Sequence, residues 1–194
     1  MADPAYIVDG VLTDGEAWVG IATIDVTGTS TTTITFTSTD DGQVGDFSQY
    51  MDLFMVGYAS GIYGFDTNLY LRYHLNNDTG SNYVYQDLDG DGSNATASTG
   101  TANNFGWLPT SDATNVFAAY TGQFFDINSG KYKSVIAQTA MDGNGAGNRV
   151  RLLASTWKSQ APITEIDFYE PNGFAFVAGS KFSLFGVLPR MVTA

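Results

Sequence analysis

The chain has 194 residues, a formal net charge of −12 and no cysteine. This length allows one substantial core, and the lack of cysteine excludes disulfides and thiolate metal sites. Because so acidic a surface repels phosphate backbones, and because no apolar stretch approaches the roughly 18 residues of a membrane span, we expect binding to neither nucleic acid nor membranes. With 22 glycines and 14% aromatic residues, the composition is typical of short strands joined by turns.

The first fifteen residues show no clear strand pattern. They contain the turn signals Asp9-Gly10 and Asp14-Gly15. We therefore expect residues 1–15 to form an N-terminal arm and residues 16–194 to form a single β-sandwich domain.

Strict alternation of apolar and polar residues dominates the remaining chain. In 69–75, for example, the odd positions are Leu, Leu, Tyr and Leu, which leaves Tyr70, Arg72 and His74 on the opposite face. We expect strands over residues 17–26, 31–37, 50–58, 68–75, 83–86, 115–125, 132–139, 149–156, 163–169, 174–178 and 182–187. Residues 90–104 are expected to form one long surface loop.

About ten strands with no helix between them predict an all-β fold. Two packed antiparallel sheets in a jelly-roll-like or lectin-like β-sandwich are the expected architecture. In the last strand, we expect Phe182, Leu184 and Val187 to line the core.

Three aspartates at alternate positions suggest a calcium loop. Asp87, Asp89 and Asp91 are followed by Gly92 at the sixth position, where such a loop makes its sharp turn. The twelfth position holds Ser98 in place of the bidentate glutamate. The alternative to a calcium site is an acidic, glycine-rich hairpin turn.

Few residues suit catalysis. His74 is the only histidine, which excludes a multi-histidine zinc site, and alternation places it on the same face as Arg72. The most plausible paired carboxylates are Glu165 with Asp167 or Glu170. Glu165 and Asp167, however, alternate with Ile166 and a phenylalanine, as on an ordinary solvated strand face. We therefore expect no catalytic residues and no cofactor, apart from the possible calcium.

The aromatic residues allow two interpretations. They could line an exposed platform for carbohydrate, or they could fill the core, as most aromatics in a sandwich of this size do. The candidates are Trp18, Trp107, Trp157, Tyr58, Tyr63 and Tyr120.

Two segments resemble those of all-β virion structural proteins from tailed bacteriophages. The first is a Leu- and Arg-containing strand, 69–73, that leads into an Asn-x-Asp-x-Gly-x-Asn-Tyr turn at 76–83. The second is the closing region 157–186, with a tryptophan, an Ile-Thr-x-Ile strand and a Gly-Ser ending. Phe185 stands where tyrosine is usual in this ending.

This resemblance implies a noncatalytic virion protein. The protein that the resemblance implies most directly is a capsid decoration, or cement, protein that binds the major capsid protein on the outer surface of the capsid as a homotrimer. A tail-associated adhesin for host surface polysaccharide is the alternative, and a lectin-like polysaccharide-degrading enzyme is a third reading. The shared segments could also record the fold alone.

Overall fold

The computed structural model describes residues 17–62, 69–109, 116–141 and 148–188, together with the backbone of two short strands near the N-terminus. The strands are β1 (Ile7–Val8), β2 (Val11–Leu12), β3 (Trp18–Asp25), β4 (Thr33–Thr37), β5 (Asp52–Ala59), β6 (Leu69–Leu75), β7 (Tyr83–Gly90), β8 (Ala95–Gly100), β9 (Asn104–Leu108), β10 (Ala118–Phe125), β11 (Lys133–Met141), β12 (Arg149–Trp157), β13 (Glu165–Tyr169) and β14 (Lys181–Val187). One 3-10 helix, η1 (Phe47–Gln49), precedes β5.

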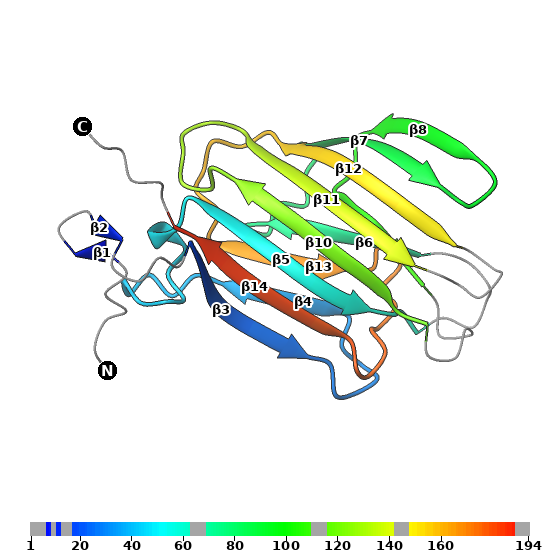
Figure 1. The fold of residues 1–194 in the computed structure, drawn as a ribbon, viewed down its shortest axis with the longest axis horizontal. Helices are drawn as coiled ribbons and strands as arrows, with labels where there is room; N and C mark the ends of the chain where they lie inside the picture. Colours follow the sequence, from blue (N-terminus) through cyan, green and yellow to red (C-terminus); the bar gives the residue numbers. More distant parts are fainter. Residues whose placement is uncertain are drawn as a thin grey trace.

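Two antiparallel sheets form the sandwich, and β1 and β2 form a separate two-stranded sheet (Figure 1). The larger sheet has eight strands in the order β3-β14-β5-β10-β11-β12-β7-β8, and the smaller has four in the order β4-β13-β6-β9. The expected all-β antiparallel sandwich is thereby confirmed, while the jelly-roll connectivity stays a prediction. No helix of the described residues is long and apolar enough to cross a membrane.

The expected N-terminal arm falls largely outside the described residues. Within it, β1 and β2 pair as a small antiparallel hairpin, although the sequence suggested no strand there. The division into an arm and one domain stays a prediction.

Aromatic rings from both sheets meet in the core. Phe168 of β13 lies at the centre, with its ring centroid 5.0 Å from that of Phe105 on β9 and 5.8 Å from that of Phe182 on β14. Phe124 of β10 lies 6.4 Å from Phe168. All four side chains are fully buried. For Phe168 and Phe182, the alternating pattern of the sequence identified the core face of the strand correctly.

The stretch 90–104, expected to be a loop, instead contains β8. This strand pairs with β7 over its whole length, and nearly all of its residues are exposed. It is an edge strand with no apolar face, which explains why hydrophobic alternation could not detect it. The strand β9 was not predicted either. Residues 174–178, which were predicted to form a strand, make only an isolated bridge between Gly61 and Phe176.

The closing strand β14 follows the expected pattern with one correction. Phe182 and Leu184 are fully buried, but the next core position is Gly186, and Val187 lies on the other face. A Cβ at position 186 would overlap the ring of Tyr50. The glycine therefore provides space for Tyr50 to pack against the strand.

The two segments that resemble virion proteins contact each other. Asn76 adopts a positive φ of 52° and its Nδ2 donates to the Pro162 carbonyl at 2.7 Å. In the same turn, Asp78 Oδ2 accepts from the buried Trp157 Nε1 at 2.7 Å. The turn thus holds the chain that follows β12, and both motifs serve the fold.

Replacing Asp78 by Ala should lower the free energy of unfolding by about 1–3 kcal/mol, because it leaves the buried Trp157 N–H without an acceptor. Urea denaturation measures this loss. The control is Asp41→Ala, since the Asp41 carboxylate accepts from Thr39 and Gln43 in an exposed turn. Equal losses for the two variants would contradict the proposed role of Trp157.

Candidate functional site

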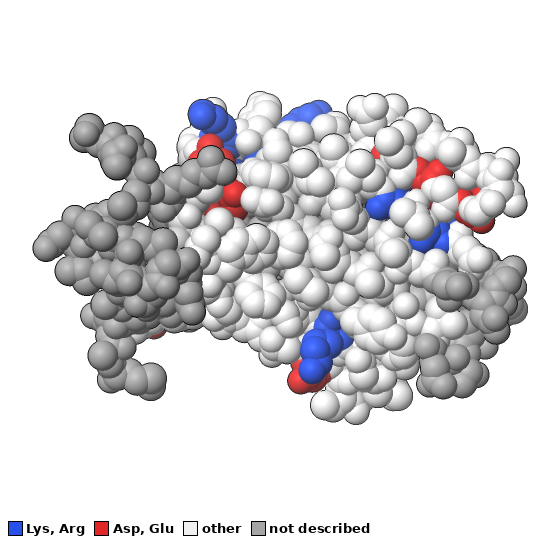
Figure 2. All heavy atoms as spheres, in the orientation of Figure 1, with Lys and Arg blue, Asp and Glu red and all other residues white. Residues whose placement is uncertain are grey.

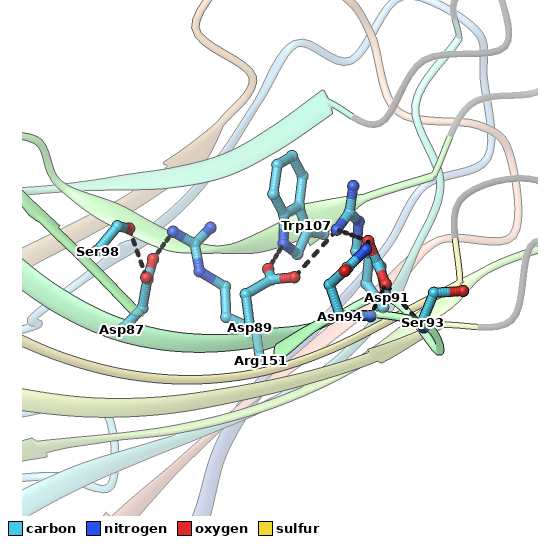
Figure 3. Close-up of polar contacts among 9 residues, drawn as sticks. Asp87, Asp89, Asp91, Ser93, Asn94, Ser98, Trp107 and Arg151 are labelled. Carbon is cyan, nitrogen blue, oxygen red and sulfur yellow. Dashed lines mark hydrogen bonds and ion pairs between the residues drawn. The ribbon is translucent and has the colours of Figure 1, made fainter. Parts of the chain in front are cut away.

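The three aspartates predicted to bind calcium lie along β7 and the turn that follows it (Figure 3). Asp87 and Asp89 are buried and share the inner face of the strand, whereas Asp91 lies in the β7–β8 turn. Alternate residues of a strand are separated by roughly 7 Å. The strand therefore spreads carboxylates that a calcium loop would bring around one ion.

Each of these carboxylates already has protein partners. Asp87 forms a buried ion pair with Arg151 of β12 and accepts from Ser98 Oγ at 2.6 Å. Asp89 accepts from Trp107 Nε1 and pairs with Arg149 at 3.2 Å. We call the three aspartates, Arg149 and Arg151 the Asp–Arg cluster.

Asp91 stabilises the hairpin turn. Its Oδ1 accepts from the backbone N–H groups of Ser93 and Asn94 at 2.8 and 2.6 Å, which is the alternative the sequence offered. Across the described ranges, no group of three or more His, Asp or Glu residues is arranged to hold a metal ion. The geometry thus gives the calcium prediction no support.

Arg151 is the more enclosed of the two cations of the cluster. Its side chain is 4% exposed, and its guanidinium carbon lies 5.2 Å from the ring centroid of Trp107 and 5.7 and 5.8 Å from those of Tyr70 and Tyr85. Arg151 Nε and Nη1 have no hydrogen-bond partner among the described residues. Burial lowers the pKa of this guanidinium, while both tyrosines oppose that shift. The cluster is therefore a buried link between the two sheets.

His74 lies on the outer side of the small sheet, as alternation predicts. It stacks on Tyr169 with ring centroids 4.3 Å apart, and the Tyr169 hydroxyl is 2.9 Å from its Nε2. Burial lowers the pKa of His74 from its usual 6.5, an effect that Asp167 and Asp78 oppose and Arg72 reinforces. The neutral imidazole is thus favoured in the folded chain.

Because the unfolded chain binds the proton more readily, stability should fall as the pH drops below 6.5 toward the lowered pKa of His74. Thermal unfolding of the wild type and of His74→Gln between pH 7.5 and 5 measures this contribution. Above pH 7 the melting temperatures of the two proteins should change with pH in the same way. Below pH 6 the wild type should lose more stability than the variant. An identical pH response would contradict the assignment.

The carboxylate pair on β13 differs from the solvated strand face expected from the sequence. Asp167 is buried and accepts from Thr35 Oγ1 at 2.5 Å, and Glu165 is half-buried and accepts from Thr37 and Asn77. The donors are the cross-strand threonines of β4 and Asn77, and alternation within one strand cannot reveal them.

The aromatic candidates divide between core and surface. Trp157 and Tyr120 are buried, whereas Tyr63 lies outside the described residues. Trp107 is half-buried and stacks on Tyr70 at 4.4 Å. Trp18 and Tyr58 are both exposed on the side of the large sheet that faces away from the small one.

That side of the large sheet is the most unusual surface of the molecule. We define the outer face as the outward side chains of β5, β10, β11, β12, β7 and β8. Its exposed apolar members are large: Val150 is 67% exposed, Leu88 58%, Tyr58 50%, Ile136 46%, Leu152 44% and Val56 41%. Monomeric proteins rarely expose so broad an apolar surface.

The outer face also lacks charge. Its described residues include no Lys, Arg or Glu, and its one aspartate, Asp52, is buried and accepts from Gln123 Nε2 and the Asp126 N–H, each at 2.7 Å. Figure 2 shows this side of the molecule, where the charged atoms form a few small groups separated by broad uncharged areas. The exposed ion pair of Lys181 with Asp25, at 3.0 Å, borders this face, because Lys181 of β14 is the cross-strand neighbour of Tyr58.

Two shallow hollows lie next to each other on the outer face. One, of about 450 Å³, is lined by residues of β7, β8 and β12 that include Leu88, Ala97 and Leu152. The other, of about 390 Å³, shares Val150 and Leu152 and extends across β11 to β10. The sequence held two signals of this face, because the outward positions of two strands carry no charge. These positions are Ser, Ile, Gln and Ala in β11, and Val, Leu, Ala and Thr in β12.

Comparisons with family models, curated proteins and solved structures gave no match for this chain.

Proposed function

We propose that this protein is a noncatalytic virion structural protein of a tailed bacteriophage, a decoration or cement protein on the outer surface of the capsid. The observation that carries the proposal is the uncharged, apolar outer face. A surface of this kind is suited to being covered by protein, because burying it releases water without stripping charges of their hydration.

The rest of the molecule suits the outside of a particle. The chain has a net charge of −12, so its charged surface repels packaged DNA and favours solvent. A rigid sandwich bound at many symmetry-related positions would reinforce the major capsid protein through contacts that are individually weak. The resemblance of 69–83 and 157–186 to virion proteins supports the same class.

Gold-labelled antibody against the purified protein, applied to intact phage particles, tests the location. We expect label over the head, and incorporation should be lost in Leu152→Glu, which places a charge in the outer face. Thr33→Glu, on the exposed side of β4, should be incorporated normally. Label confined to the tail, or normal incorporation of Leu152→Glu, would contradict the proposal.

A tail-associated adhesin is the second candidate, and one observation favours it. The stacked Tyr70 and Trp107 rings are half-buried beside Arg72, and such aromatic and polar neighbours are used to bind sugar rings. A glycan array tests this function. Binding that disappears in Tyr70→Ala would support the adhesin, and the absence of binding would dismiss it.

A further inference from the structure

We infer that the small sheet binds, on its outward side, a saccharide that carries a carboxylate, and that Arg72 recognises this acid. We define the small-sheet face as the outward side chains of β4, β13, β6 and β9. It lies on the opposite side of the sandwich from the outer face. The inference rests on the second candidate function and deepens it, because it names the chemistry of the ligand and the residue that selects it.

Arg72 lies in the middle of the small-sheet face. On β6 it stands between Tyr70 and His74, two positions from each. Its cross-strand neighbours are Tyr169 on β13 and Asn104 on β9. The side chain is half-buried, and its Nε donates to Asn104 Oδ1 at 3.2 Å. This bond orients the guanidinium and leaves its two Nη groups for a ligand.

Arg72 differs from the other described arginines in its lack of a carboxylate partner. Arg149 pairs with Asp89 and Arg151 pairs with Asp87, whereas none of the ion pairs among the described residues includes Arg72. A guanidinium without an acidic neighbour is unusual in a chain with 20 acidic and 8 basic residues. Because a planar guanidinium binds a carboxylate through two parallel hydrogen bonds, the Nη groups of Arg72 suit an acid from outside the chain.

The two carboxylates of the small-sheet face are already hydrogen-bonded and lie toward its other end. Tyr169 of β13 is the cross-strand neighbour of Arg72. Asp167 and Glu165 precede Tyr169 by two and four residues, which is roughly 7 and 13 Å along the strand. Salt screens exposed charges beyond about 8 Å at physiological ionic strength. An acid bound at Arg72 would therefore meet the guanidinium at short range and these carboxylates over a distance that weakens their repulsion.

Stacked rings flank this arginine on both sides. Tyr70 and Trp107 stack with ring centroids 4.4 Å apart, and Tyr169 and His74 stack with centroids 4.3 Å apart. All four rings are half-buried, so each pair leaves part of its apolar surface to solvent. The exposed Thr33 is the cross-strand neighbour of Tyr169 and offers a hydroxyl group. The face thus combines apolar rings for a sugar, a hydroxyl for its polar groups and a cation for its acid.

The rings are held in place by the fold. The Trp107 carbonyl accepts from the buried Tyr120 hydroxyl at 2.5 Å, and its indole N–H donates to Asp89. The Tyr169 hydroxyl accepts from Asn103 Nδ2 at 2.9 Å. Binding to such a surface orders few side chains, which favours affinity. Fixed rings on one sheet face suit a saccharide better than a peptide, which is commonly bound along a strand edge or in a groove.

The test is a glycan array on which each acidic bacterial saccharide stands beside its carboxyl-reduced form, which differs from it only at the acid group. The comparison of these two forms on the wild type needs no variant. Arg72→Gln then removes the cation and keeps an amide donor. Lys131→Gln is the matched control, because it changes the net charge equally at an exposed side chain in the β10–β11 turn. Circular dichroism during heating checks that both variants fold.

We expect the wild type to bind one or more acidic saccharides at least about tenfold more tightly than their reduced forms, because hydrogen bonds between charged groups are strong. Arg72→Gln should lose this preference, and Lys131→Gln should keep it. Equal binding of both forms by the wild type, or an unchanged preference in Arg72→Gln, would overturn the inference and leave the adhesin function standing. A wild type that binds no saccharide would overturn both, while the labelling of phage heads tests the leading function independently.

Discussion

Asp87→Leu should lower the free energy of unfolding by about 3–5 kcal/mol, the largest loss we expect from a single charged residue. The substitution leaves Arg151 buried at 4% exposure without its carboxylate. Two of the Arg151 nitrogens have no hydrogen-bond partner among the described residues even in the wild type. Removing Asp87 therefore leaves an uncompensated charge between the sheets.

The double variant Asp87→Leu/Arg151→Met should recover most of that loss, because an apolar pair of similar size carries no buried charge. Urea denaturation of the wild type, both single variants and the double variant measures the coupling. Arg149→Met is the matched control and should cost less, since its partner Asp89 keeps the bond from Trp107. A double variant as unstable as Asp87→Leu would refute the account of this cluster.

Phe168→Ala should cost about 3–5 kcal/mol through the cavity it leaves. Its ring lies between the sheets and contacts those of Phe105, Phe124 and Phe182. Because these three rings belong to two different sheets, they cannot all shift to fill the space that the Phe168 ring leaves. Thermal and urea unfolding should agree on the size of the loss.

Phe168→Leu provides the graded comparison, because it removes less volume and should cost less than the alanine variant. A loss below about 1 kcal/mol for Phe168→Ala would mean that the site collapses easily or is not central. Either outcome would contradict the described packing of the two sheets.

Alternation predicted much of the fold from the sequence. The odd positions of 69–75 are buried in β6, and the strand positions of Phe168, Phe182 and Leu184 face the core. These residues are predictable because burial on one side of a strand repeats every second position. The same rule has no information where both sides are exposed, which is why β8 was missed.

The candidate site depended on contacts that sequence spacing does not contain. Asp87, Asp89 and Asp91 have the spacing of a calcium loop, yet their partners come from β12 and β9, more than ten residues away. An extended strand separates ligands that a curled loop would gather. The bonds that could be predicted from the sequence are those of Asp91 with the N–H groups of its own turn.

The outer face was partly visible in the sequence. Outward positions of β11 and β12 lack charged residues although the chain has 20 acidic and 8 basic side chains. Register then placed those uncharged positions next to Tyr58 and Leu88 on one surface. The extent of that surface required the strand order, which alternation does not provide.

The most direct test of the central claim is the binding of the purified protein to phage heads, detected with gold-labelled antibody in electron micrographs, with Leu152→Glu as the comparison. Attachment through the outer face predicts label over the head for the wild type and a loss of that label for the variant. Label confined to the tail, or equal labelling of the head by both proteins, would contradict the claim.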